Sequence, residues 1–159
     1  MWPGIIFSGR TLYGFALWGL KGVRCFLDTS IVVYANDASD PRKQALALDT
    51  VVRHMRERSG TISTQVLQEY AVVAVKKLKQ AVPVVVHQLH LLESLSVVQI
   101  SPGLVRRALE VQQIYGLSYW DSLILSAGES AACDTLLTED LDAGSFYCGM
   151  ICKNPFVED

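Results

Sequence analysis

Four carboxylates in this sequence of 159 residues lie where acidic side chains are uncommon. Asp28 and Asp140 each follow a short apolar run, whereas Glu69 and Asp121 lie among apolar residues of helix-like segments. If such acids gather at one point, each like-charge pair within about 4–6 Å costs on the order of 4 kcal/mol. A divalent cation removes that cost, and all-oxygen sites favour Mg²⁺ or Mn²⁺. The bound ion would activate water and stabilise charge on a phosphoryl oxygen, which is hydrolytic chemistry.

Each acid also has a simpler interpretation when it is considered alone. Asp28 and Asp140 would be helix N-caps, because an aspartate after a strand often accepts hydrogen bonds from the first turn of a helix. Glu69 would pair with Lys76 further along the same helix. Asp121 would be a first-turn acid that the helix dipole favours. Four separate roles of this kind explain the pattern less well than one shared site does.

The elements that must position these acids alternate between strands and helices. The apolar run that stops at Asp28 predicts a buried strand whose carboxyl end presents this residue. Further strands are predicted at 61–63, 97–100, 135–137 and 149–154, and helices at 30–36, 41–58, 64–79, 83–94, 102–116 and from 117 onward. This alternation implies right-handed crossovers and a mostly parallel sheet, at whose carboxyl edge Asp28 and Asp140 would both emerge.

The composition, 50% hydrophobic and 19% charged, is that of one compact domain. The net charge of −2 provides no global attraction to nucleic acid, so a polyanion would be held by a local patch or through a metal. The four cysteines include no C-x-x-C pair. We therefore interpret them as reduced core thiols of a cytoplasmic protein.

Residues 1–22 are predicted to be an N-terminal extension, and the folded domain is predicted to span 23–159. The extension has no clean helical or alternating period, and its apolar stretch is shorter than the ~20 residues that cross a bilayer. Arg10 and Lys21 lie in the wrong places for a secretory signal peptide. One interpretation is that translation starts at Val23 and that the preceding residues belong to the gene model only. The other is that they are translated.

Four blocks of sequence carry a resemblance to a known family. They are Phe-Leu-Asp-Thr-Ser-Ile-Val-Val-Tyr-Ala at 26–35, Ile-Ser-Thr-Gln-Val-Leu-Gln-Glu-Tyr at 62–70, Tyr-Trp-Asp-Ser-Leu-Ile at 119–124 and Leu-Leu-Thr-Glu-Asp-Leu at 136–141. In their order, spacing and structural context they resemble the PIN-domain family, specifically the toxin ribonucleases of VapBC-type toxin–antitoxin pairs. The resemblance implies an α/β fold of three layers, α/β/α, around a mostly parallel central sheet of four to five strands.

The resemblance also implies a catalytic acidic quartet that holds one or two Mg²⁺ ions, or Mn²⁺ as a substitute: Asp28, Glu69, Asp121 and Asp140. These ions would activate water to cut phosphodiester bonds in RNA. Three hydroxyl residues would orient the carboxylates by hydrogen bonds: Thr29, Ser30 and Thr138. Asn is frequent in the family at the position of Ser30. A homodimer and a small VapB-like antitoxin protein, whose tail occupies the active groove, are further implied partners, and no membrane partner is expected.

Other functional classes fit these residues less well. Haloacid-dehalogenase-like phosphatases need a second aspartate where this chain has Ser30. Response-regulator receivers need paired acids near the start and a late lysine after a strand, and the sequence has neither. A PIN-fold protein that binds nucleic acid without cleaving it, or that is directed to DNA, stays an alternative. The roles of Glu139 and Asp142, two further acids near the quartet, are left open.

Two sets of surface residues have open interpretations. The helical segments 63–79 and 83–94 contain more Val and Leu than one inward stripe needs, which fits either an exposed patch for a partner or a helix buried on two sides. The basic residues could contact phosphates or form a solvated face: Arg42, Lys43, Lys76, Lys77, Lys79, Arg106 and Arg107.

Overall fold

Short apolar runs form the central strands of the sheet, as the sequence predicts. The computed structural model describes residues 22–157. Five strands run parallel, namely β1 (Cys25–Leu27), β2 (Gly60–Ser63), β3 (Ser96–Val98), β4 (Thr135–Leu137) and β6 (Met150–Lys153). A sixth, β5 (Phe146–Tyr147), pairs antiparallel with β6. The spatial order is β3-β2-β1-β4-β6-β5, so the sheet has one strand more than the predicted four to five.

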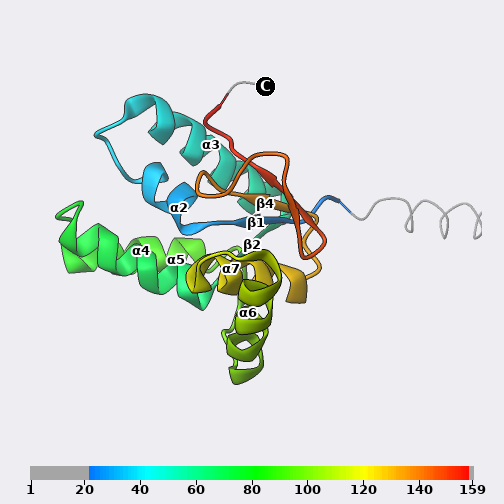
Figure 1. Ribbon diagram of the computed structural model, residues 1–159. Coiled ribbons are helices and arrows are strands. Elements are labelled where there is room, and N and C mark those ends of the chain that lie inside the picture. Colours follow the sequence, from blue (N-terminus) through cyan, green and yellow to red (C-terminus); the bar gives the residue numbers. More distant parts are fainter. Residues whose placement is uncertain (1–21, 158–159) are drawn as a thin grey trace, which may run out of the picture.

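Helices cover both faces of this sheet, which confirms the predicted three-layer α/β/α arrangement. They are α2 (Thr29–Ala35), α3 (Pro41–Glu57), α4 (Thr64–Lys76), α5 (Val82–Leu92), α6 (Pro102–Tyr115) and α7 (Tyr119–Ser130). In Figure 1, α2 and α3 lie on one side of the sheet and α4 to α7 lie on the other. The predicted helix starts are confirmed, because Asp40 caps α3 and Ser101 caps α6, each followed by proline.

The order of the strands creates a crevice beside β1. The chain proceeds from β1 to β2 and then β3 in one direction, and it returns to place β4 on the other side of β1. Leu27 pairs in register with Leu137, so the carboxyl ends of β1 and β4 lie next to each other. In Figure 1 this edge faces left, where α2 begins. Ligands of open α/β sheets bind at such points, where the strand order changes direction.

The core lies between the sheet and its helices. Its largest fully buried side chains come from every layer, and they include Phe26, Leu27, Ile62, Tyr70, Leu125 and Leu136. Tyr70 satisfies its hydroxyl by donating a hydrogen bond of 2.6 Å to Gln88. All four cysteines are unpaired, as expected. Cys25, Cys133 and Cys152 are buried, and Cys148 is partly exposed.

Of the predicted N-terminal extension, residues 1–21 lie outside the described residues, which begin at Gly22. The start of translation at Val23 stays a prediction. Within 22–157, no helix combines the length and the apolar character that crossing a bilayer requires.

Gly60 at the start of β2 is a position where we expect a small substitution to destabilise the fold. A Cβ atom there would lie 2.7 Å from Leu95 Cδ2 and 2.9 Å from His54 Cβ, so Gly60→Ala overpacks the core. The free energy of unfolding should fall by about 1–3 kcal/mol in urea titrations. Gly103→Ala is the matched control in α6, because the nearest atom to its Cβ would be at an ordinary 3.5 Å. Equal stability of the two variants would contradict the packing described here.

Candidate active site

Asp28 is a buried carboxylate at the carboxyl end of β1, with 7% of its surface exposed. Its Oδ1 accepts a hydrogen bond of 2.6 Å from the Thr29 amide, so the residue does cap α2, as its simpler interpretation predicts. Its Oδ2 accepts a second hydrogen bond, of 2.7 Å, from the hydroxyl of Thr138. Capping therefore accounts for only one of the two oxygens, and the other connects β1 to the segment after β4.

Thr138 links Asp28 to Asp140. While its hydroxyl donates to Asp28, it also accepts a hydrogen bond of 3.0 Å from the Asp140 amide. Burial, together with the nearby negative charge of Asp140, raises the pKa of Asp28 to about 7, although the hydrogen bond from Thr138 lowers it. Asp140 is exposed and precedes no helix, so the capping interpretation fails for this residue. The sheet edge thus holds two mutually repelling carboxylates.

Glu69 approaches the same edge from α4. Its Oε2 accepts a hydrogen bond of 2.5 Å from the Thr29 hydroxyl, and its Oε1 accepts one of 2.9 Å from Gln65 Nε2. These contacts, rather than an ion pair with Lys76, occupy both oxygens. Because Thr29 also follows Asp28 directly, Glu69 is bound to the neighbour of the buried carboxylate.

Asp121 lies in the first turn of α7. Its Oδ2 accepts a hydrogen bond of 2.6 Å from Ser118, the N-cap, and its amide donates one of 3.1 Å back to the Ser118 hydroxyl. This reciprocal cap fits the simpler interpretation of the residue. Gln65 Nε2 also donates to the Trp120 carbonyl at 3.3 Å, which ties the start of α7 to α4. Gln65 therefore connects the Glu69 side chain to the residue before Asp121.

The hydroxyl residues predicted to orient the carboxylates behave differently from one another. Thr29 donates a hydrogen bond to Glu69, and Thr138 donates one to Asp28. The hydroxyl of Ser30 is buried and has no hydrogen-bond partner in the described chain. A buried hydroxyl without a partner marks a place that an additional polar group could complete.

The donor chemistry of this edge fits a hard divalent cation. Among residues 22–157, no three side chains of Asp, Glu, His or Cys stand close enough to hold one ion together. Mg²⁺, however, is often held by one or two carboxylates, with water and substrate phosphate completing its shell. Asp28 and Asp140 offer such a pair, and a cation between them would offset their repulsion. Binding by all four acids stays a prediction.

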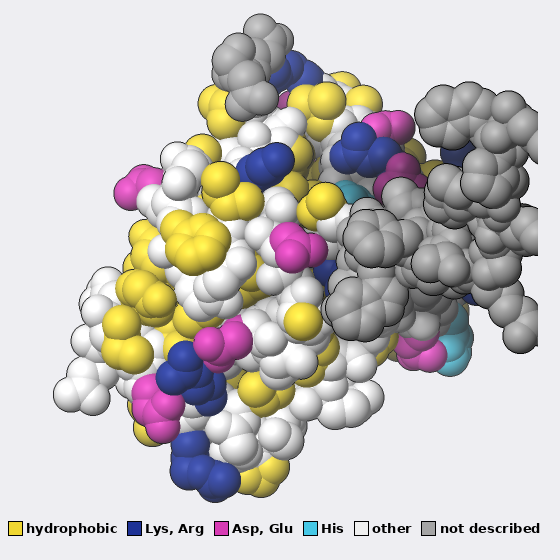
Figure 2. Space-filling view, turned by 90° about the vertical axis from the view of Figure 1, so that its right-hand side faces the viewer, with side chains coloured by type: hydrophobic (Ala, Val, Ile, Leu, Met, Phe, Trp, Pro, Cys, Tyr) yellow, Lys and Arg dark blue, Asp and Glu magenta, His cyan; other side chains and the backbone are white. Residues whose placement is uncertain are grey.

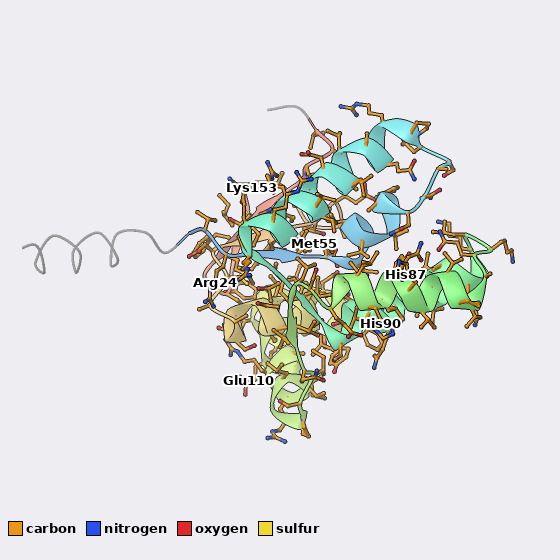
Figure 3. All side chains as sticks on the ribbon, turned by 180° about the vertical axis from the view of Figure 1, so that it is seen from behind. Arg24, Met55, His87, His90, Glu110 and Lys153 are labelled. Carbon is orange, nitrogen blue, oxygen red and sulfur yellow. The ribbon has the colours of Figure 1, made fainter. Side chains whose placement is uncertain are left out.

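The three histidines contribute nothing to this donor set. Figure 3 shows His87 and His90 on α5. His54 lies in α3, where its Nδ1 is 2.7 Å from the Ser59 hydroxyl and burial lowers its pKa. A site of carboxylate and hydroxyl oxygens favours Mg²⁺ or Mn²⁺ over zinc or copper.

Residues 25–147 match the family model of the PIN domain. The chain belongs to the PIN domain family. A comparison with curated proteins gives no match.

Several solved structures share the fold of this PIN domain. A toxin-antitoxin complex from Klebsiella pneumoniae is 21% identical, with a TM-score of 0.53 over 73% of this chain and 86% of that chain. VapC20 from Mycobacterium tuberculosis, a toxin that cleaves the sarcin-ricin loop, is 18% identical, with a TM-score of 0.56 over 70% and 86%. VapBC2 from Rickettsia felis, bound to a DNA fragment from its promoter, is 22% identical, with a TM-score of 0.56 over 82% and 97%. At these identities the likeness concerns the fold alone.

The sequence did not indicate two contacts that support the site. One is the bridge that Gln65 makes between Glu69 and Trp120, for which the i,i+4 spacing of Gln65 and Glu69 was the only available signal. The other involves Lys43 of α3, whose Nζ lies 2.6 Å from Glu139 Oε2 and 3.1 Å from the Tyr34 hydroxyl. Because Glu139 lies between Thr138 and Asp140, this ion pair anchors the segment that carries both residues.

Proposed function

We propose that this protein is a divalent-cation-dependent endoribonuclease and the toxin of a VapBC-type toxin–antitoxin pair. The observation that carries the proposal is the buried Asp28, joined through Thr138 to Asp140 at the point where the strand order changes direction. A fold gains nothing from holding repelling carboxylates there unless a cation or substrate uses them. Membership of the PIN domain family and the likeness in fold to VapC toxins support the same reaction class.

In the proposed site, Asp28 and Asp140 would hold the cation, and Glu69 and Asp121 would complete the acidic edge. Mg²⁺ or Mn²⁺, when held there, would lower the pKa of a coordinated water and stabilise charge on a phosphoryl oxygen. Thr138 keeps Asp28 oriented by donating to its Oδ2, and Thr29 does the same for Glu69. The ion pair of Lys43 with Glu139 holds the segment between Thr138 and Asp140 in place.

RNA is the proposed substrate. On the face shown in Figure 2, basic and acidic side chains are interspersed with apolar ones, so this face has no continuous positive patch. Lys43 is already paired with Glu139, the residue before Asp140, at 2.6 Å. We therefore propose that the backbone phosphates are held mainly at the acidic edge through the cation, with few contacts to a basic surface.

We propose two protein partners, a small antitoxin protein and a second copy of the chain. We also propose that the protein is located in the cytoplasm. The apolar side chains at the end of α4 and along α5 support an interaction surface: Val75, Val82, Val84, Val86 and Leu91 are exposed. Clusters of exposed apolar residues commonly mark protein interfaces. The toxin role would be contradicted if induced expression of the unaltered chain left growth unchanged.

A cleavage assay tests the proposed reaction. The purified protein is incubated with single-stranded RNA, structured RNA and DNA of matched sequence, in Mg²⁺, Mn²⁺ or EDTA. We expect RNA to be cut internally and only when the cation is present. Cleavage of DNA alone would support the DNA-directed alternative, and RNA binding without cleavage would support a silent binding protein. Equal cleavage in EDTA would contradict the cation-dependent mechanism.

Thr138→Val should reduce RNA cleavage by about 10–100-fold, as expected for a residue that orients a metal ligand. Valine has a similar shape, but it cannot donate to Asp28 or accept from the Asp140 amide. Thr138→Ser keeps the hydroxyl and serves as the control, with a rate close to that of the unaltered protein. The two rates are compared at saturating Mg²⁺ after thermal unfolding confirms that both variants fold. Equal rates would exclude this role for Thr138.

A further inference from the structure

An open groove of about 460 Å³ adjoins the acidic edge. Thr29 and Glu69, which hydrogen bond to each other, line it together with Gln68 and Val72 of α4 and Trp120 of α7. The groove is therefore continuous with the proposed catalytic site, and its walls combine an apolar surface with a carboxylate. A ligand that fills it must satisfy both kinds of surface.

Trp120 is the most unusual residue of this groove. Trp120 is 61% exposed, although tryptophan is usually largely buried. The residue is held from two sides, because its carbonyl accepts from Gln65 Nε2 at 3.3 Å and its ring packs edge to face on Tyr119, with centroids 5.2 Å apart. The backbone of Trp120 is thus tied to α4, while its ring, in contact with Tyr119, stays exposed directly before Asp121.

We propose that Trp120 is a stacking platform for a base of the RNA substrate beside the phosphate that is cut. Bases of any sequence can stack on an exposed aromatic ring, and this is a common way to hold single strands. The position fits, since the same groove contains Glu69 and Trp120 adjoins Asp121. Gln68 is exposed in the groove and offers amide donors and an acceptor to the edge of the stacked base.

The carboxylate in the groove favours a nucleotide over an apolar protein segment. An apolar side chain placed against Val72 and Trp120 would also cover Glu69 and remove water from its charge without compensation. A nucleotide presents an apolar base face to Trp120 and carries its phosphate, with the cation, to the acidic edge. This inference rests on the proposed ribonuclease function and names how that site would hold its substrate.

Binding of RNA without turnover tests the stacking platform. Fluorescein-labelled single-stranded RNA of mixed sequence is titrated with the protein in Ca²⁺ in place of Mg²⁺, which is expected to occupy the cation site without supporting cleavage, and anisotropy gives the dissociation constant. Trp120→Ala should weaken binding about tenfold, whereas Trp120→Phe should stay within about threefold, because a ring is retained. Phe146→Ala is the matched control, since Phe146 is an exposed aromatic residue, 67% exposed, of β5 outside the groove.

An abasic series makes the test specific for stacking. Each RNA of the series lacks one base. Removal of the base that stacks on Trp120 should weaken binding to the protein that has Trp120, but it should weaken binding to Trp120→Ala little further. Such non-additive effects indicate a direct contact between the base and the ring. Unchanged binding by Trp120→Ala would overturn the inference while the ribonuclease proposal stands. The inference would also be overturned if Trp120→Ala leaves RNA binding intact and disrupts self-association in sedimentation. The groove would then be a protein interface. If the protein with Trp120 neither binds nor cleaves RNA, the proposed function itself fails.

Discussion

Asp28→Asn is expected to reduce RNA cleavage by at least about a hundredfold and, at the same time, to stabilise the cation-free protein at pH 8. Asparagine has the shape of aspartate and is an equally good N-cap, so α2 keeps its first hydrogen bond. It lacks the negative charge that would bind the cation. It also removes a charge that is buried and repelled by Asp140, which is why stability should rise.

Cleavage rates in Mg²⁺ and urea unfolding in EDTA, both at pH 8, measure the two effects on the same preparations. Asp49→Asn is the matched control, because Asp49 is an exposed aspartate of α3, and it should change neither quantity by much. Loss of activity together with loss of stability would indicate that Asp28 mainly supports the fold. Retained activity would remove Asp28 from the proposed mechanism.

The second large effect concerns pH. Without cations, the contribution of Asp28 to the free energy of unfolding should fall by on the order of 4 kcal/mol as the pH rises from about 4 to about 7. The direction follows from a pKa of about 7 in the folded protein against the usual 3.8 in the unfolded chain. The folded state binds the proton more tightly, so this stability is fully present below pH 4 and is lost as the pH rises through 7.

Urea unfolding in EDTA across this pH range, compared between the unaltered protein and Asp28→Asn, isolates the contribution of this carboxyl. The difference in stability between the two should grow in favour of Asp28→Asn as the pH rises, since asparagine does not titrate. Mg²⁺ at pH 8 should recover stability in the unaltered protein only, by preferential binding to the folded state. A difference that stays constant with pH would show that Asp28 is not buried and repelled as described.

The elements around the site could be predicted from the sequence because local patterns determine them. The apolar run before Asp28 and the Ser-Pro and Asp-Pro helix starts at 101–102 and 40–41 depend on neighbours in the chain. β5 could not be predicted, because a strand of two residues has no period. It exists through its pairing with β6 across a turn in which Cys148 and Gly149 both have positive φ, 50° and 82°.

The site was only partly predictable, because local sequence patterns do not specify contacts between residues that are far apart in the chain. Parallel strands place Asp28 and the segment after β4 at one edge, so their proximity follows from topology. The bridge from Gln65 to Trp120 and the ion pair of Lys43 with Glu139 join residues 55 and 96 positions apart, and no local pattern specifies such contacts. The sequence predicts a phosphate contact or a solvated residue at Lys43, whereas in the structure Lys43 anchors the segment that carries Asp140.

Titration of the purified protein with Mn²⁺, followed by the electron paramagnetic resonance signal of the free ion, tests most directly whether the acidic edge is a cation site. We expect the unaltered protein and the Asp49→Asn control to bind Mn²⁺, with Mg²⁺ competing for the same site. Asp28→Asn and Asp140→Asn should each abolish or strongly weaken this binding. Mn²⁺ binding that is equally tight in the unaltered protein and in both variants would contradict the account, because the cation would then be held away from the carboxyl edge of β1 and β4.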